Sequence, residues 1–192
     1  RLNLVRGEWY RRPLSISKTT VLRAAAYHPD YMATNVDSQT YVFPEEVIRQ
    51  NGQGLSETWG TFPYSSSIGG TTWEIGDPVP SDWDMDPSIV EDPRYRDEIV
   101  SSLTSIPTVS LAVDPIDLFG EQGIYIHPLR KGREWERPVS VEYMDPNSKA
   151  EFQIDAGVRV HGGASRRPDQ TRKHSLRLYF RGDYDPTGDL EF

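Results

Sequence analysis

Alternating apolar and polar residues predict two neighbouring strands late in the chain. In EFQIDAGVRVHGG (151–163) every second residue is apolar: Phe152, Ile154, Ala156, Val158 and Val160. In HSLRLYF (174–180) the same period places Leu176, Leu178 and Phe180 on one face. A period of two is typical of a strand with one buried face, so we expect an antiparallel hairpin. If the strands pair in this sense, Arg159, Arg177 and Arg181 share the polar face.

Shorter runs before this hairpin extend the same pattern. PTVSLAV (107–113), GIYIHP (123–128) and RPVSVEYMDP (137–146) are rich in β-branched or aromatic residues and end at turn signals. DPIDLFG (114–120) predicts a turn with a short helical piece. Together these segments predict about five strands in an antiparallel meander, with a helix packed on it, and therefore an α+β, β-rich fold.

The first 48 residues also predict strands. PLSIS (13–17), TTVLRAAAY (19–27) and SQTYVFP (38–44) are separated by polar or turn segments. Three strands are too few for an independent β-sandwich, so we expect the others to precede residue 1. PEEVIRQ (44–50) predicts a short helical turn, because Pro44 suits a first helical position and two Glu follow it.

Residues 49–104 form a long connector with little periodicity. Its aromatic residues indicate that it lies over a surface, because side chains of that size are seldom left in water; they are Trp59, Phe62, Tyr64, Trp73 and Trp83. One amphipathic helix is predicted from Pro93 to about Leu103, capped by Asp92. The tryptophans have two interpretations, stacking on sugar rings or filling a core, and the second is favoured because large aromatic side chains usually contribute more when buried.

Composition limits the classes of partner. The chain has 192 residues, 21 Lys and Arg against 29 Asp and Glu, and a net charge of −8, which argues against binding a nucleic-acid duplex. It has no cysteine, so disulfides and thiolate metal sites are excluded. The sequence contains no run of 18 apolar residues, so it predicts no membrane-spanning helix. The first residues lack both an initiator Met and the apolar core of a signal peptide, so we expect the sequence to be an excerpt.

Charges are unevenly distributed between two regions. From Glu74 to Glu98 there are nine acidic residues and two Arg. The spacing of Asp82, Asp84 and Asp86 imitates the start of an EF-hand, but prolines stand at the sixth and twelfth loop positions, where Gly and Glu are needed. No metal site is therefore predicted. The acidic block is most simply a solvated face.

Residues 159–181 contain the opposite excess, seven Arg or Lys against the single Asp169. Like charges on one sheet face are unfavourable unless an anion joins them. That anion is either the acidic block or a phosphate ligand, whose approach Gly162 and Gly163 would permit. On physical grounds a plain hairpin turn is the commoner role of such a glycine pair. We expect His161 and His174, which flank the loop, to be surface residues.

Family resemblance sharpens this comparison. The segments SIPTVSLAVDPIDLFGEQGIYIHP, WERPVSVEY and AGVRVHGGASRRPDQTRKHSLRLYF, in this order, resemble the N-terminal portion of the CotH family, bacterial spore-coat proteins described as atypical protein kinases. DWDMDPSIVEDPRYRDEI resembles a segment that precedes this portion in large exported bacterial proteins. Residues 13–43 look like the last strands of the chitobiase/β-hexosaminidase C-terminal module, a small immunoglobulin-like sandwich.

The resemblance implies three parts and a phosphate site. The parts are the end of the sandwich module at 1–48, the acidic irregular connector at 49–104, and a kinase-like N-lobe at 105–192. In kinases a glycine-containing hairpin covers the ATP phosphates and a Lys pairs with them. The residues that correspond to the family pattern, spaced R-x-x-G-x-x-S…K in this sequence, and their neighbours are placed near phosphate by the resemblance: Arg159, Gly162, Gly163, Ser165, Arg172 and Lys173. Lys173 is the candidate for the α/β-phosphates. His174 stands where relatives often have a second Lys, for which Arg172 would compensate.

No catalytic residue is assigned in this chain, because the family's catalytic aspartates follow in a larger lobe. ATP with Mg²⁺ or Mn²⁺ is therefore expected only in the full-length protein, and the chain alone is predicted to be inactive. The resemblance also implies export to the cell surface and a protein or glycan partner, beside the rest of the parent polypeptide. The alternative function is a non-catalytic carbohydrate-binding or adhesive surface or coat protein that uses Trp59, Trp73 and Trp83.

Overall fold

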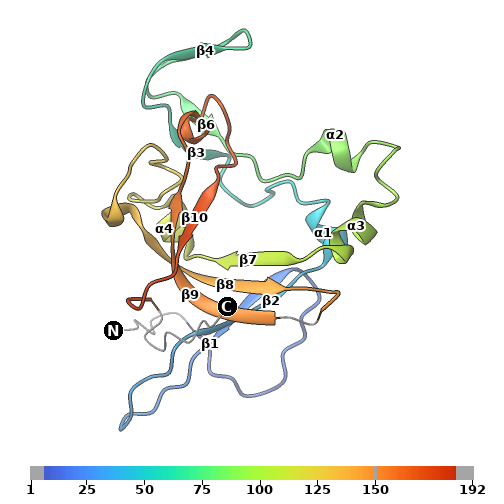
Figure 1. The fold of residues 1–192 in the computed structure, drawn as a ribbon, viewed down its shortest axis with the longest axis vertical. Helices are drawn as coiled ribbons and strands as arrows, with labels where there is room; N and C mark the ends of the chain where they lie inside the picture. Colours follow the sequence, from blue (N-terminus) through green and yellow to red (C-terminus); the bar gives the residue numbers. More distant parts are fainter. Residues whose placement is uncertain (1–6, 149–150, 185–192) are drawn as a thin grey trace.

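The computed structural model describes residues 7–148 and 151–184, and β-structure dominates them (Figure 1). A four-stranded sheet consists of β7 (Thr108–Ala112), β8 (Arg137–Met144), β9 (Glu151–Val160) and β10 (Leu176–Tyr179). Its order is β10-β9-β8-β7, and each neighbouring pair is antiparallel. The sheet curls along β8 and β9 (Figure 1). The predicted antiparallel meander is confirmed, with four strands in place of about five.

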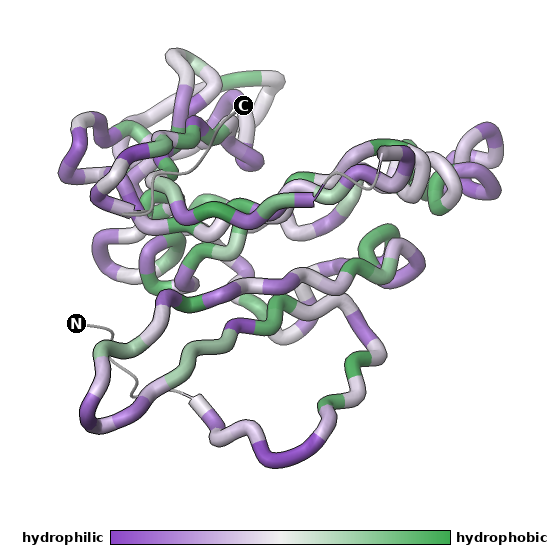
Figure 2. Tube along the Cα trace, turned by 60° about the horizontal axis from the view of Figure 1, so that its bottom comes forward, coloured by the Kyte–Doolittle hydropathy of each residue, from purple (hydrophilic) through white to green (hydrophobic). Residues whose placement is uncertain are grey.

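One face of this sheet carries the core. The buried members are Ile124, Val139, Val141, Ile154, Ala156, Val158 and Val160. On β9 they recur at every second residue from Ile154, as the strand period requires. Partly buried residues from β7, β10 and α4 (Pro115–Phe119) pack against them, among them Leu111, Leu118 and Leu178. Figure 2 shows hydrophobic and hydrophilic residues interspersed along the whole trace, with hydrophilic residues at several of the outer loops.

The register of β9 and β10 agrees with the sequence pattern. Val160 lies opposite Leu176, and Arg159 lies directly opposite Arg177. The predicted burial was wrong at one end of each apolar stripe: Phe152 is 39% exposed and Phe180 is 47% exposed. Phe180 follows the last residue of β10, beyond the part of the strand that pairs with β9.

The predicted strand at 123–128 was wrong. This segment folds back on α4: Ile124 and Tyr125 donate their backbone N–H groups to the carbonyls of Asp117 and Leu118, at 2.9 and 3.0 Å. Because these backbone N–H groups are already hydrogen-bonded within the segment and to α4, they are not available to pair with a neighbouring strand. Its apolar residues still reach the core, where Ile124 is 2% exposed. A 3₁₀ turn at Arg133–Trp135 then leads into β8.

Near the N-terminus, β1 (Thr20–Ala24) and β2 (Asp37–Tyr41) form a separate antiparallel pair. The predicted strand at 13–17 is absent from this part of the described chain, where β1 and β2 pair only with each other. Strand β2 lies on β8 through a buried carboxylate. Glu142 accepts a 3.0 Å hydrogen bond from the Thr40 backbone N–H and another from the Thr40 hydroxyl. The pair is followed by α1 (Pro44–Val47), as predicted.

The connector is more regular than the sequence indicates. It contains two small antiparallel sheets, β3 (Thr58–Thr61) with β6 (Pro78–Pro80) and β4 (Ser66–Ile68) with β5 (Thr71–Trp73). It also contains α2 (Pro87–Val90) and α3 (Ile99–Ser105). The helix predicted from Pro93 begins six residues later than expected.

The delay has a local cause. Asp92 does accept a hydrogen bond from the Arg94 backbone N–H, at 2.8 Å, but it closes a turn over 93–98 before α3 begins. In the described part of the chain, no helix is long and apolar enough to cross a bilayer.

Candidate functional site

The loop between β9 and β10, residues 161–175, is the candidate site (Figure 1). The His161 backbone N–H donates to the Ser175 carbonyl at 2.7 Å, which continues the pairing of the two strands by one step. A 3₁₀ turn, η2 (Ala164–Arg166), follows the two glycines. We call residues Gly162–Ser165 the glycine turn.

Only glycine suits the first position of the glycine turn. Gly162 has φ +121°, a left-handed conformation that disfavours side chains, and a Cβ there would collide with the Ser165 hydroxyl. Gly163 has φ −103° and open space beside it. Gly163, Ala164 and Ser165 are exposed. The turn therefore presents backbone close to the surface with little side-chain cover.

Within residues 7–148 and 151–184, the amides of Gly162, Gly163, Ala164 and Ser165 donate no hydrogen bond. Successive free N–H groups in a tight turn form a concave donor set that suits an anion. This is the one chemical property of the loop that a plain hairpin turn does not require.

Two buried side chains hold the turn from below. The Arg166 side chain donates to the carbonyls of Leu129 and Arg130, the second at 3.3 Å, and Arg166 is only 5% exposed. His174 is 9% exposed, and its Nδ1 lies 3.3 Å from the Ser165 carbonyl oxygen. Because that oxygen can only accept, Nδ1 is the donor. Burial lowers the pKa of His174, against the raising effect of this hydrogen bond.

The prediction that His174 is a surface residue was therefore wrong, whereas His161 is exposed. His174 lies near the end of the loop, and its ring lies 5.4 Å from that of Tyr125. Tyr125 comes from the segment that folds back on α4. The sequence contains no signal for this contact, because it joins residues 49 positions apart through a fold-back that periodicity missed.

The connector also holds the loop, through Asp169. Its side chain is fully buried and accepts hydrogen bonds from Tyr64 Oη (2.8 Å), Ser66 Oγ and Arg167 Nη2 (2.8 Å). Burial alone would raise the pKa of Asp169, but the hydrogen bonds from Ser66, Tyr64 and Arg167 together lower it. Asp169 is thus a structural carboxylate.

A second carboxylate neutralises the polar face of the hairpin. The Glu136 side chain is fully buried and lies 3.4 Å from Arg159 Nε and 3.0 Å from Arg181 Nε. Arg159 Nε is buried and makes no hydrogen bond, so its contact with Glu136 is a charge interaction alone. Both guanidinium groups also lie over the Tyr179 ring, at 3.9 and 5.0 Å. The anion expected on this face is therefore Glu136, which sequence reasoning did not single out.

The end of the loop carries the remaining candidate cations. Lys173 Nζ lies 2.9 Å from Asp82 Oδ1 and donates to the Asp84 carbonyl. Asp82 belongs to the acidic block, one of the two partners that the sequence predicts for these cations. Arg172 makes no hydrogen bond, ion pair or ring contact within the described residues. It is the uncommitted cation closest in sequence to the glycine turn.

The six residues expected near phosphate do not all gather in one place. Gly162, Gly163 and Ser165 form the glycine turn, and Arg172 with Lys173 closes the same loop before β10. Arg159 is different, because its guanidinium is held by Glu136 and Tyr179 on the face of the sheet. The structure therefore separates five loop residues from one sheet residue.

The three tryptophans contact other aromatic rings. Trp59 is 5% exposed and lies with its ring centroid 5.1 Å from Trp83 and 5.9 Å from Phe119. Trp73 stacks on Phe62 at 4.7 Å and is partly buried. The core interpretation describes Trp59, and the others extend the same packing.

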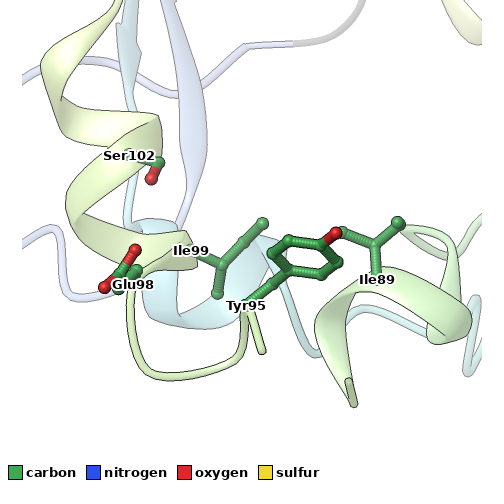
Figure 3. Close-up of a pocket in the computed structure, with 5 residues that line it drawn as sticks. All are labelled: Ile89, Tyr95, Glu98, Ile99 and Ser102. Carbon is green, nitrogen blue, oxygen red and sulfur yellow. The ribbon is translucent and has the colours of Figure 1, made fainter. Parts of the chain in front are cut away.

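Apolar cavities lie elsewhere. One of 210 Å³ lies between α2 and α3, where Tyr95 stands between Ile89 and Ile99 (Figure 3). Another of 440 Å³ is lined by residues of α1, α3 and the ends of β7 and β8. In the described residues no three His, Cys, Asp or Glu side chains are grouped to hold a metal ion.

Comparison with known proteins returned no matching family model, no matching curated protein and no matching solved structure.

Proposed function

We propose that the glycine turn binds the phosphates of a nucleoside triphosphate, and that the chain is the phosphate-binding part of a CotH-like phosphotransferase. The observation that carries this proposal is the run of four unused N–H groups at Gly162–Ser165, three of them on exposed residues. Donors of this kind stabilise a phosphate oxyanion without reorganising when it arrives. The motif resemblance assigns the same residues to phosphate.

Two cations complete the proposed site. Arg172 has no protein partner in the described chain, so a phosphate would give it one. Lys173 would exchange Asp82 for a phosphate oxygen, because its pair with Asp82 is about half exposed and such pairs are weak. Arg159 would act indirectly, by neutralising the buried Glu136 behind the turn.

Phosphoryl transfer would also require a divalent cation, which supplies neutralisation of the phosphate charge when it is bound. This needs carboxylates, and the family places them in a larger lobe after the strand that β10 resembles. We therefore expect the loop to bind and orient phosphate, with transfer only in a protein that contains that lobe. The proposal includes a kinase N-lobe for 105–192, an immunoglobulin-like module for 1–48, and an exported protein.

Carbohydrate binding has less support as a function. A sugar-stacking tryptophan presents one face of its ring to solvent. Trp59 is nearly fully buried, Trp73 stacks on Phe62, and Trp83 packs edge-on against Trp59.

Thermal unfolding with ATP and Mn²⁺ tests the proposal. A ligand at ten times its Kd adds about 1.4 kcal/mol of stability, which raises Tm by roughly 3–6 °C in a domain of this size. We expect this shift for the wild type and for Lys131→Ala, which removes an exposed Lys outside the loop. Lys173→Ala should abolish most of it. Equal shifts in all three proteins would contradict the proposal.

A further inference from the structure

The connector places a carboxylate on the Lys of the proposed phosphate site. We call Asp82–Asp84 the acidic segment. Asp82 Oδ1 lies 2.9 Å from Lys173 Nζ, and the Asp84 carbonyl accepts a hydrogen bond from the same ammonium. Two oxygens of the acidic segment therefore already accept from the ammonium that a phosphate would need.

Trp83 fixes the acidic segment in this position. Its ring packs against Trp59 and Phe119, with centroids 5.1 and 5.2 Å away, and its Nε1 donates to the Ser56 carbonyl at 2.8 Å. The other side of the ring covers Gly52, where a Cβ would collide with it. Because the indole is anchored, the two oxygens stay beside Lys173 whether or not they bind it.

The connector contacts the β9–β10 loop at a second place. Tyr64 and Ser66 donate to the buried Asp169, midway between η2 and Lys173. The loop and the connector are therefore held together by contacts that do not involve Lys173. Opening the Asp82–Lys173 pair would leave these contacts in place, so the acidic segment keeps a high effective concentration near the ammonium.

The Asp82–Lys173 pair is weak enough to be exchanged. The two side chains are 39% and 49% exposed, and pairs so exposed change an equilibrium by a factor of about five at most. A ligand with several charges offers a stronger partner than one carboxylate, because its attraction to the ammonium is larger.

We propose that the acidic segment is an intramolecular competitor for the phosphate site, in which Asp82 holds Lys173 until a polyphosphate displaces it. This inference rests on the proposed function, because it concerns the regulation of the same loop. Its consequence is an affinity that is lower than the loop alone would give, by the same factor for each phosphate ligand that needs Lys173.

Calorimetric titration with inorganic triphosphate tests this inference. Asp82→Asn removes the competing charge and should bind about two- to fivefold more tightly than the wild type, the range set by an exposed pair. Asp97→Asn is the matched control, because it makes the same charge change at an 83% exposed Asp whose partner is Arg96. It should bind as the wild type does. In a Lys173→Gln background, Asp82→Asn should give a smaller gain.

The outcomes separate the two proposals. Equal affinities for wild type and Asp82→Asn, or an equal gain in Asp97→Asn, would overturn the competitor while leaving phosphate binding intact. Detectable triphosphate binding by Asp82→Asn, with none by the wild type or Asp97→Asn, would support the competitor. No binding by any variant, with unchanged thermal unfolding, would overturn the phosphate site itself. Inorganic monophosphate, titrated in parallel, should gain by the same factor from Asp82→Asn, because the competitor reduces the fraction of free Lys173 for either ligand.

Discussion

At the scale of single residues, buried polar side chains shape the candidate loop. The side chains of Glu136, Asp169 and Arg166 are all buried. Each of them forms ion pairs or hydrogen bonds with other protein groups. Buried charges without partners would be costly, so each contact fixes a geometry as well as neutralising a charge. The glycine turn is exposed because these residues position it from beneath.

His174 makes this support sensitive to pH. Burial depresses its pKa below the ordinary value near 6.5. Below that value the unfolded chain binds a proton that the folded chain resists, so stability should fall as pH falls from 7.5 to 5.5. The slope from one such group cannot exceed about 1.4 kcal/mol per pH unit.

Urea unfolding at three pH values checks this expectation. His174→Gln keeps an amide donor for the Ser165 carbonyl and cannot titrate, so its stability should fall less with pH. His28→Gln, at an exposed histidine paired with Asp30, should follow the wild-type profile. Parallel profiles for the wild type and His174→Gln would contradict the assignment.

At the scale of elements, local pattern predicted the strands that pair with sequence neighbours. The β9–β10 register, β8 and α4 follow from a period of two and from a proline after Asp114, and all four appear. The pattern failed where distant contacts decide the structure. The pattern of residues 123–128 predicts a strand, yet the N–H groups of Ile124 and Tyr125 bond to α4.

The candidate site shows the same division. Alternation identified the basic face of the hairpin and its need for an anion, and the glycine pair identified the turn. Neither identified Glu136 as the partner of Arg159 and Arg181, or the burial of Asp169, because both depend on tertiary contacts: Glu136 and Arg181 are 45 positions apart, and Tyr64 and Asp169 are 105 positions apart. The partner of Lys173 was among the two anions expected.

The glycine turn itself gives a prediction at this scale. Gly162→Ala puts a Cβ at φ +121° against the Ser165 hydroxyl, so it should lower the unfolding free energy by about 1–3 kcal/mol. Gly163→Ala enters open space at negative φ and should cost about 1 kcal/mol or less. Chemical denaturation of both variants makes the comparison. A larger loss in Gly163→Ala would refute the described turn.

At the scale of the whole molecule, the connector packs against the β9–β10 loop and α4. It ties the loop through Asp169 and Lys173, and it stacks Trp59 and Trp83 on Phe119 of α4. The N-terminal strand pair attaches separately, through Thr40 and the buried Glu142. The acidic block and the basic hairpin therefore meet within one chain, which explains how a protein of net charge −8 keeps a local excess of cations at a turn.

The most direct test of phosphate binding at the glycine turn is a titration of the ¹⁵N-labelled chain with inorganic triphosphate, followed by amide chemical shifts. We predict saturable shifts concentrated at Gly162–Ser165 and at Arg172 and Lys173, and their loss in Lys173→Gln but not in Lys131→Gln. Saturable shifts located elsewhere, or none at these amides at millimolar triphosphate, would contradict the account.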